Sequence, residues 1–180
     1  MSKNIQILDC TLRDGGLGLE DAEKNDLSHV RFSENDSRMT AGYLADSAID
    51  IIELGSIEIT SDDRTGFCIY KNIEDISKQM PLKKKQNQMF AALYRGPDTP
   101  IDDIPKWNPS LCEAVRVIIR YSELQKSLDF CAALSSKGYK VFVQPMLTMR
   151  YTKEEIQLLI EKSNEMNAYA LYLSLIHISE

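Results

Sequence analysis

Short apolar runs alternate with amphipathic stretches along this chain, and turn residues separate them. The apolar runs predict strands, while capping residues followed by apolar positions three and four apart predict helices. The predicted strands comprise residues 4–10, 49–54, 88–94, 114–121, 140–145 and 169–173. The predicted helices comprise residues 38–47, 73–79, 123–136 and 153–166. The polar segment 17–32 is expected to be a loop.

Turn and capping residues support these boundaries. A capping cluster at residues 33–36 precedes the first helix, and Ser122 is expected to cap the third. Gly138 is expected to end that helix in the left-handed conformation. Thr152 and Glu155 have the spacing of a capping box at the start of the last helix.

Six strands alternating with helices predict an α/β protein with a parallel sheet and right-handed crossovers. Two architectures fit this order, a doubly wound open sheet and a (β/α)8 barrel. A barrel typically needs about 250 residues and eight β/α units. The 180 residues supply about six units. The chain is therefore either an open sheet or a partial barrel.

Composition narrows the class of protein. Hydrophobic residues make up 43% of the chain and charged residues 27%, which predicts a folded globular protein. The net charge of -6 disfavours nucleic acid as a partner. We find neither an apolar stretch of about 20 residues, as a membrane span requires, nor a signal-peptide core. The four cysteines share no CxxC spacing and are expected to be reduced and mostly buried, so we expect a cytoplasmic protein.

The stretch DCTLRDGG at 9–16 follows the first predicted strand, where parallel α/β folds bind their ligands. A carboxylate there is a suitable oxygen ligand for Mg²⁺ or Mn²⁺. A guanidinium could bind a substrate carboxylate or stabilise an enolate oxygen. Two glycines allow a ligand to approach the backbone closely. The same residues also fit a simple capped turn.

This stretch resembles the opening signature of the DRE-TIM metallolyases, the barrel superfamily that includes 3-hydroxy-3-methylglutaryl-CoA lyase and isopropylmalate synthase. The residues of this motif are most similar to those of the aldolase catalytic domain branch, which resembles the 4-hydroxy-2-oxovalerate aldolases. Further similarity lies in IDIIELG at 49–55, DRTGF at 63–67 and GYKVFVQPM at 138–146. The resemblance covers residues 4–173 and implies a partial TIM (β/α)8 barrel of about six of the eight units.

The resemblance also implies roles for individual residues. Arg13 corresponds to the catalytic arginine that holds the enolate or keto oxygen, and Asp14 to the metal-binding aspartate. Glu53, Gln144 and Gly15 are the candidate substrate-binding residues, with Glu53 holding Arg13 or the substrate. The implied cofactor is Mn²⁺ or Mg²⁺, and the implied substrates are a 2-oxo acid such as pyruvate and an aldehyde.

Two features depart from the family. Its metal site is completed by a His-x-His pair, whereas this chain has only His29 and His177, which form no such pair. His29 is interpreted as a solvated loop residue. The ending SLIHISE at 174–180 resembles a translated sequencing adapter, so we expect a C-terminally truncated domain at 1–173 with a non-native tail.

Three hypotheses about function follow. The first is a metal-dependent aldolase or lyase fragment that is inactive by itself, or a Claisen-type acyltransferase of the isopropylmalate synthase kind. The second is a flavodoxin-like domain that binds phosphate at Gly15 and Gly16, although the spacing of a P-loop is missing. The third is an inert product of a truncated gene. A partial barrel exposes sheet edges, so homo-oligomers are also expected.

Overall fold

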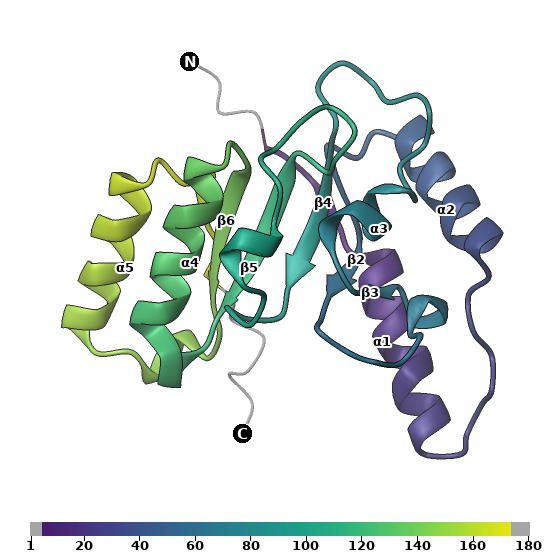
Figure 1. Cartoon of the computed structure of the whole chain (residues 1–180), viewed down its shortest axis with the longest axis horizontal. Coiled ribbons are helices and arrows are strands. Elements are labelled where there is room, and N and C mark those ends of the chain that lie inside the picture. The colour runs from purple at the N-terminus through teal and green to yellow at the C-terminus, as the bar shows by residue number, and fades with distance from the viewer. Residues whose placement is uncertain (1–4, 174–180) are drawn as a thin grey trace. The chain divides into compact units, whose positions relative to one another are not determined.

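The computed structural model describes residues 5–173 of the 180-residue chain. The predicted tail at 174–180 lies outside the described residues. Strands and helices alternate, and every strand pair that we describe below is parallel. The main path of the sheet runs β1-β2-β4-β5-β6-β7 (Figure 1). This six-strand path, with its βα repeats, confirms the predicted α/β class and forms a partial TIM-like barrel.

The described chain divides into two compact units, and each is described by itself. Unit 1 comprises residues 5–92 and 109–113, and unit 2 comprises residues 93–108 and 114–173.

Unit 1 is built around β2, in which every residue from Ile51 to Ile57 is buried. β1 pairs with β2, with Leu8 opposite Ile51, and a short strand β3 also pairs with β2. The helices α1, α2 and α3 all contact β2 and cover it from solvent. The elements are β1 (Leu8–Asp9), α1 (Thr11–Lys24), α2 (Glu34–Asp46), β2 (Ile51–Ile57), β3 (Ile69–Tyr70), α3 (Ile73–Ser77) and most of β4 (Met89–Tyr94).

In unit 2, helix α4 covers one face of the paired strands β5 and β6 (Figure 1). Nearly all residues of β5 are buried, on both faces of the strand, as are Val141 to Val143 of β6. Gly138 has a φ of +95° just after α4, which confirms its predicted left-handed conformation. The elements are β5 (Ala114–Ile119), α4 (Leu124–Ser136), β6 (Lys140–Pro145), α5 (Lys153–Glu165) and β7 (Ala170–Leu171).

Both predicted capping signals are confirmed. Ser33 and Asp36 form a capping box at α2, which begins at Glu34 rather than at residue 38, and Thr152 and Glu155 form one at α5. The predicted cap at Ser122 is wrong. A 3₁₀ turn at Tyr121–Glu123 precedes α4, and Glu123 is its N-cap without a side-chain hydrogen bond.

The loop predicted at 17–32 is wrong for residues 17–24, because α1 continues to Lys24, and is confirmed for residues 25–32. The buried residues of α1 are Leu12, Gly16 and Glu20. Their spacing of four is helical, but a glycine and a glutamate hide the apolar periodicity that identifies helices in a sequence. The strand predicted from residue 4 forms regular pairing only at 8–9. Among residues 5–173, no helix is long and apolar enough to cross a membrane.

Candidate functional site

Asp9 prepares the start of α1. Its Oδ1 accepts a hydrogen bond from the backbone N–H of Thr11 at 2.9 Å, and its Oδ2 accepts one from the Thr11 hydroxyl at 2.9 Å. The two hydrogen bonds therefore fix the turn of the chain from β1 into the helix. One turn further on, the side chain of Arg13 is directed back toward β2.

Arg13 and Glu53 form an ion pair in unit 1. The Nε–H of Arg13 donates to Oε1 of Glu53, and its Nη1 lies 2.7 Å from Oδ1 of Asp14. The Glu53 side chain is completely buried, while Arg13 is 19% exposed and Asp14 is 63% exposed. Glu53 is the third residue of β2 and lies inside the strand, whereas the predicted strand 49–54 placed it next to the end.

The environment keeps Arg13 charged. Burial by itself lowers the pKa of the guanidinium, but the charge of Glu53 and the hydrogen bonds of Arg13 outweigh this, so the pKa is raised above its ordinary value. The guanidinium of Arg13 is therefore a fixed positive charge that carries only hydrogen-bond donors. It lies at the start of α1, near the positive end of the helix dipole.

Asp14 does not have the surroundings of a metal ligand in this part of the chain. Its carboxylate is exposed and paired with Arg13. Residues 5–173 contain no group of three His, Cys, Asp or Glu side chains that could hold a metal ion. Divalent ions need several ligands fixed in geometry, so the described residues do not fit Mn²⁺ or Mg²⁺ binding.

Gly15 and Gly16 lie inside α1 rather than in a loop. A β-carbon at Gly15 would contact the ring of Phe32 at 3.6 Å, and one at Gly16 would overlap the carbonyl group of Phe67. The two glycines therefore allow close packing within unit 1. The predicted substrate contact of Gly15 stays a prediction.

Gln144 lies in unit 2, next to the last residue of β6. Its Oε1 accepts a hydrogen bond from Nη2 of Arg116, which projects from β5. The sequence analysis did not single out Arg116. The signal was a single cation inside the apolar run AVRVII at 114–119.

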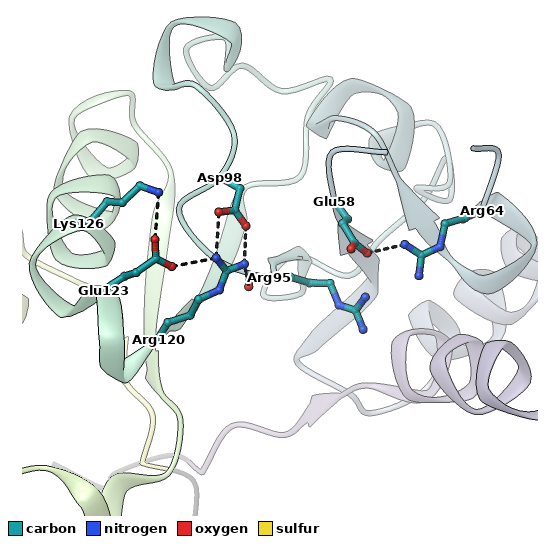
Figure 2. A network of polar contacts seen from close by, with 7 residues as sticks. All are labelled: Glu58, Arg64, Arg95, Asp98, Arg120, Glu123 and Lys126. Carbon is teal, nitrogen blue, oxygen red and sulfur yellow. Dashed lines mark hydrogen bonds and ion pairs between the residues drawn. The ribbon is translucent and has the colours of Figure 1, made fainter. Parts of the chain in front are cut away.

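Arg120, also missed from the sequence, is the centre of a polar network in unit 2 (Figure 2). Its Nη1 and Nη2 donate to the two carboxylate oxygens of Asp98, and Nη2 also donates to the backbone carbonyl of Arg95 at 3.0 Å. Glu123 accepts a hydrogen bond from Nη1 of Arg120 at 2.9 Å and another from Lys126 at 3.2 Å. These bonds hold the segment that follows β4 against the end of β5.

The DRTGF segment at 63–67 has a structural explanation. Arg64 donates to Glu20 of α1 and to Glu58 at 2.7 Å, and Figure 2 shows the second of these pairs. Asp63 accepts hydrogen bonds from the backbone and hydroxyl of Thr65. The segment thereby fastens α1 to the end of β2.

The remaining candidates of the sequence analysis lie as expected. His29 is exposed in the segment between α1 and α2. Cys68, Cys112 and Cys131 are buried free thiols, and Cys10 is half-buried at the N-cap of α1. Burial raises the pKa of both Cys112 and Cys131 to about 12.

Comparison with known proteins identifies a similar fold. The chain matches a solved structure described as the "N-terminal domain of a putative aldolase from Bacteroides vulgatus", with a TM-score of 0.59 and 17% sequence identity. The match covers 94% of this chain and 62% of that chain, so the chain spans about three fifths of the solved protein. At this identity the likeness shows an aldolase-like fold. No family model matches the chain, and no curated protein matches it.

Proposed function

We propose that the chain is the N-terminal part of a carbon–carbon lyase or aldolase that acts on a 2-oxo acid. The observation that carries the proposal is the pairing of Arg13 with Glu53. A permanently charged guanidinium is anchored by a completely buried carboxylate directly after the first strand. In barrel enzymes this end of the strands is where substrates bind. The similarity of the fold to that of a putative aldolase domain agrees with this proposal.

The chemistry assigned to Arg13 is stabilisation of an oxyanion. In aldol cleavage a base removes the proton of the hydroxyl group, the carbon–carbon bond breaks, and an aldehyde is released. The electron pair of that bond stays with the 2-oxo acid as an enolate, which is later protonated on carbon. Negative charge develops on the keto oxygen, where the N–H donors of Arg13 would bind it most strongly.

A divalent metal is part of this proposal only for the complete enzyme. The resemblance implies that Asp14 is a metal ligand. Residues 5–173 do not supply two further ligands beside it. Bound Mn²⁺ or Mg²⁺ would act as a Lewis acid on the keto oxygen. The chain as it stands is proposed to bind a 2-oxo acid through Arg13 without turning it over.

The alternatives gain no specific support. A Claisen-type acyltransferase would use Arg13 for an enolate in the same way, and no observation favours it. The phosphate-binding hypothesis relied on Gly15 and Gly16 as a loop. Both are helical, and the carbonyl group of Phe67 occupies the space beside Gly16.

Pyruvate binding tests the proposal. We expect calorimetric titration of the 180-residue chain to show binding that Arg13→Ala weakens at least about tenfold, as loss of a charged hydrogen bond predicts. Arg13→Lys keeps a counter-charge for Glu53 but lacks the planar fork, so it should fold and still bind weakly. Arg38→Ala is the matched control, because Arg38 pairs with Glu34 on the exposed surface of α2. Unchanged affinity in a folded Arg13→Lys or Arg13→Ala variant would refute the assignment.

A further inference from the structure

Arg13 has two carboxylate partners that differ in burial, and all three residues lie in unit 1. Glu53 projects from β2, its side chain is completely buried, and it accepts a hydrogen bond from the Nε–H of Arg13. Asp14 follows Arg13 in α1, its side chain is 63% exposed, and its Oδ1 lies 2.7 Å from Nη1 of Arg13. The same guanidinium therefore has one partner inside the protein and one partner in contact with solvent.

The pair with Glu53 is a permanent one. A buried carboxylate that lost its cation would be left as an uncompensated charge, which strongly destabilises a protein. An anion from solution therefore does not replace Glu53 at the Nε edge of Arg13. The side chain of Cys10 is a third polar neighbour and also forms a hydrogen bond with the guanidinium. These contacts hold Arg13 in place whether or not a ligand is bound.

The pair with Asp14 is easily exchanged. Successive residues of a helix do not share a face, so the helix does not hold the two side chains together. Because Asp14 is exposed, solvent screens its attraction to Arg13, and such pairs contribute little to stability. A carboxylate from solution offers the same acceptor oxygens, and a guanidinium can bind two of them through parallel hydrogen bonds. Asp14 therefore competes with any anionic ligand for Arg13.

We propose that Asp14 is a placeholder for the carboxylate of the ligand. It pairs with Nη1 of Arg13 in the free protein and must move away before an anion binds there. The chain thus contains its own competitor, which lowers the affinity of Arg13 for anions. That the anion is a 2-oxo acid rests on the function proposed above. The competition does not rest on it, because it follows from the position and the charge of Asp14.

Removing the charge of Asp14 should strengthen binding, whereas loss of a residue that binds the ligand weakens it. Asp14→Asn keeps the size of the side chain and removes its negative charge. We expect calorimetric titration to show an affinity for pyruvate that rises about two- to fivefold, the range that corresponds to an exposed ion pair. High salt should reduce this gain, because it screens the competing charge. Asp14→Glu keeps the charge, so its affinity should stay closer to that of the wild type.

The matched control is Asp21→Asn, which removes the same charge from an exposed position of the same helix. It should leave pyruvate affinity unchanged, which separates direct competition from a general effect of net charge. Melting temperatures show whether each variant is folded. An affinity in the folded Asp14→Asn variant that is equal to or lower than that of the wild type would overturn the proposal.

Acetate distinguishes failure of this inference from failure of the proposed function, because it carries a carboxylate but no keto group. We expect Asp14→Asn to raise the affinity for both anions, with pyruvate bound more tightly than acetate. An equal rise without any preference for pyruvate would support the placeholder and overturn the proposed function. Pyruvate binding that Arg13→Lys weakens and Asp14→Asn leaves unchanged would support the function and overturn the placeholder. If neither anion binds to the wild type or to Asp14→Asn, both proposals are wrong.

Discussion

Gly16 of α1 packs directly against the backbone carbonyl group of Phe67. A β-carbon at Gly16 would lie 2.5 Å from the carbonyl carbon of Phe67 and still closer to its oxygen. The obstacle is backbone, which cannot swing aside as a side chain can. The close approach of α1 to the 3₁₀ turn at Thr65–Phe67 therefore requires glycine.

Alanine substitutions in α1 should separate this contact from helix propensity. Gly16→Ala should lower the free energy of unfolding by about 2 kcal/mol or more, because overpacking forces the helix and the turn apart. Gly18→Ala is the control in the same helix, since its β-carbon would have no atom within 4 Å. It should stabilise the protein by about 0.5–1 kcal/mol. Urea denaturation measures both, and equal effects at the two positions would contradict this packing.

The network around Arg120 should stabilise unit 2 more than its surface position suggests. Arg120→Ala removes donors from Asp98, Glu123 and the carbonyl of Arg95 together, so we expect a loss of about 1–2 kcal/mol. Lys126→Ala removes only an exposed bond to Glu123 and should cost less than about 0.5 kcal/mol. Thermal unfolding in low and high salt checks both values. Equal losses would show that the bonds of Arg120 contribute no more than an isolated surface pair.

The cysteines should differ in reactivity toward iodoacetamide. Burial raises the pKa of Cys112 and Cys131 to about 12, so at pH 8 both remain almost entirely protonated as well as covered. Cys68 is fully buried too, whereas Cys10 is partly exposed. Mass spectrometry of the native protein should show modification at Cys10 first, with the other three labelled only after unfolding. Rapid labelling of Cys131 in the folded chain would contradict its burial.

The elements that the sequence predicted well are those whose local signals agree with their packing. The β-branched run at Ile51 and the Thr152–Glu155 capping box lie in the predicted strand and helix. Helix α1 was missed entirely because its buried face includes Gly16 and Glu20. Glu20 is buried through contact with Arg64, which is 44 residues away, and no local pattern reveals such a partner.

The candidate site was likewise predicted only in part from the sequence. The resemblance implied that Glu53 holds Arg13 or the substrate, and the structure pairs Glu53 with Arg13. It did not show that the adjacent glycines are helical, because their surroundings come from Phe32 and Phe67. Arg116 was overlooked because a charged residue in an apolar strand is recognised only when its partners in neighbouring strands are known.

Metal ions should have little effect on this chain. Asp14 is exposed, paired with Arg13 and without two further ligands among residues 5–173. We therefore expect a chelator to leave the melting temperature unchanged, and stoichiometric Mn²⁺ not to raise it, because only tight binding stabilises a protein by mass action. A rise in melting temperature that Asp14→Asn abolishes would show that a complete metal site exists in this chain.

The coupling between Arg13 and Glu53 should exceed that of a surface pair. Glu53 is completely buried, so its attraction to the guanidinium is weakly screened by solvent. A double-mutant cycle with Arg13→Met and Glu53→Gln should give a coupling energy of about 1.5–3 kcal/mol. The control cycle uses Arg38 and Glu34, an exposed pair one turn apart on α2, for which about 0.3–0.5 kcal/mol is expected. Added salt should reduce the control coupling and leave the first largely unchanged, since buried pairs are poorly screened. Coupling energies of equal size, with equal salt dependence, would mean that Glu53 does not anchor Arg13. The arginine would then lack the fixed position that stabilisation of an enolate requires.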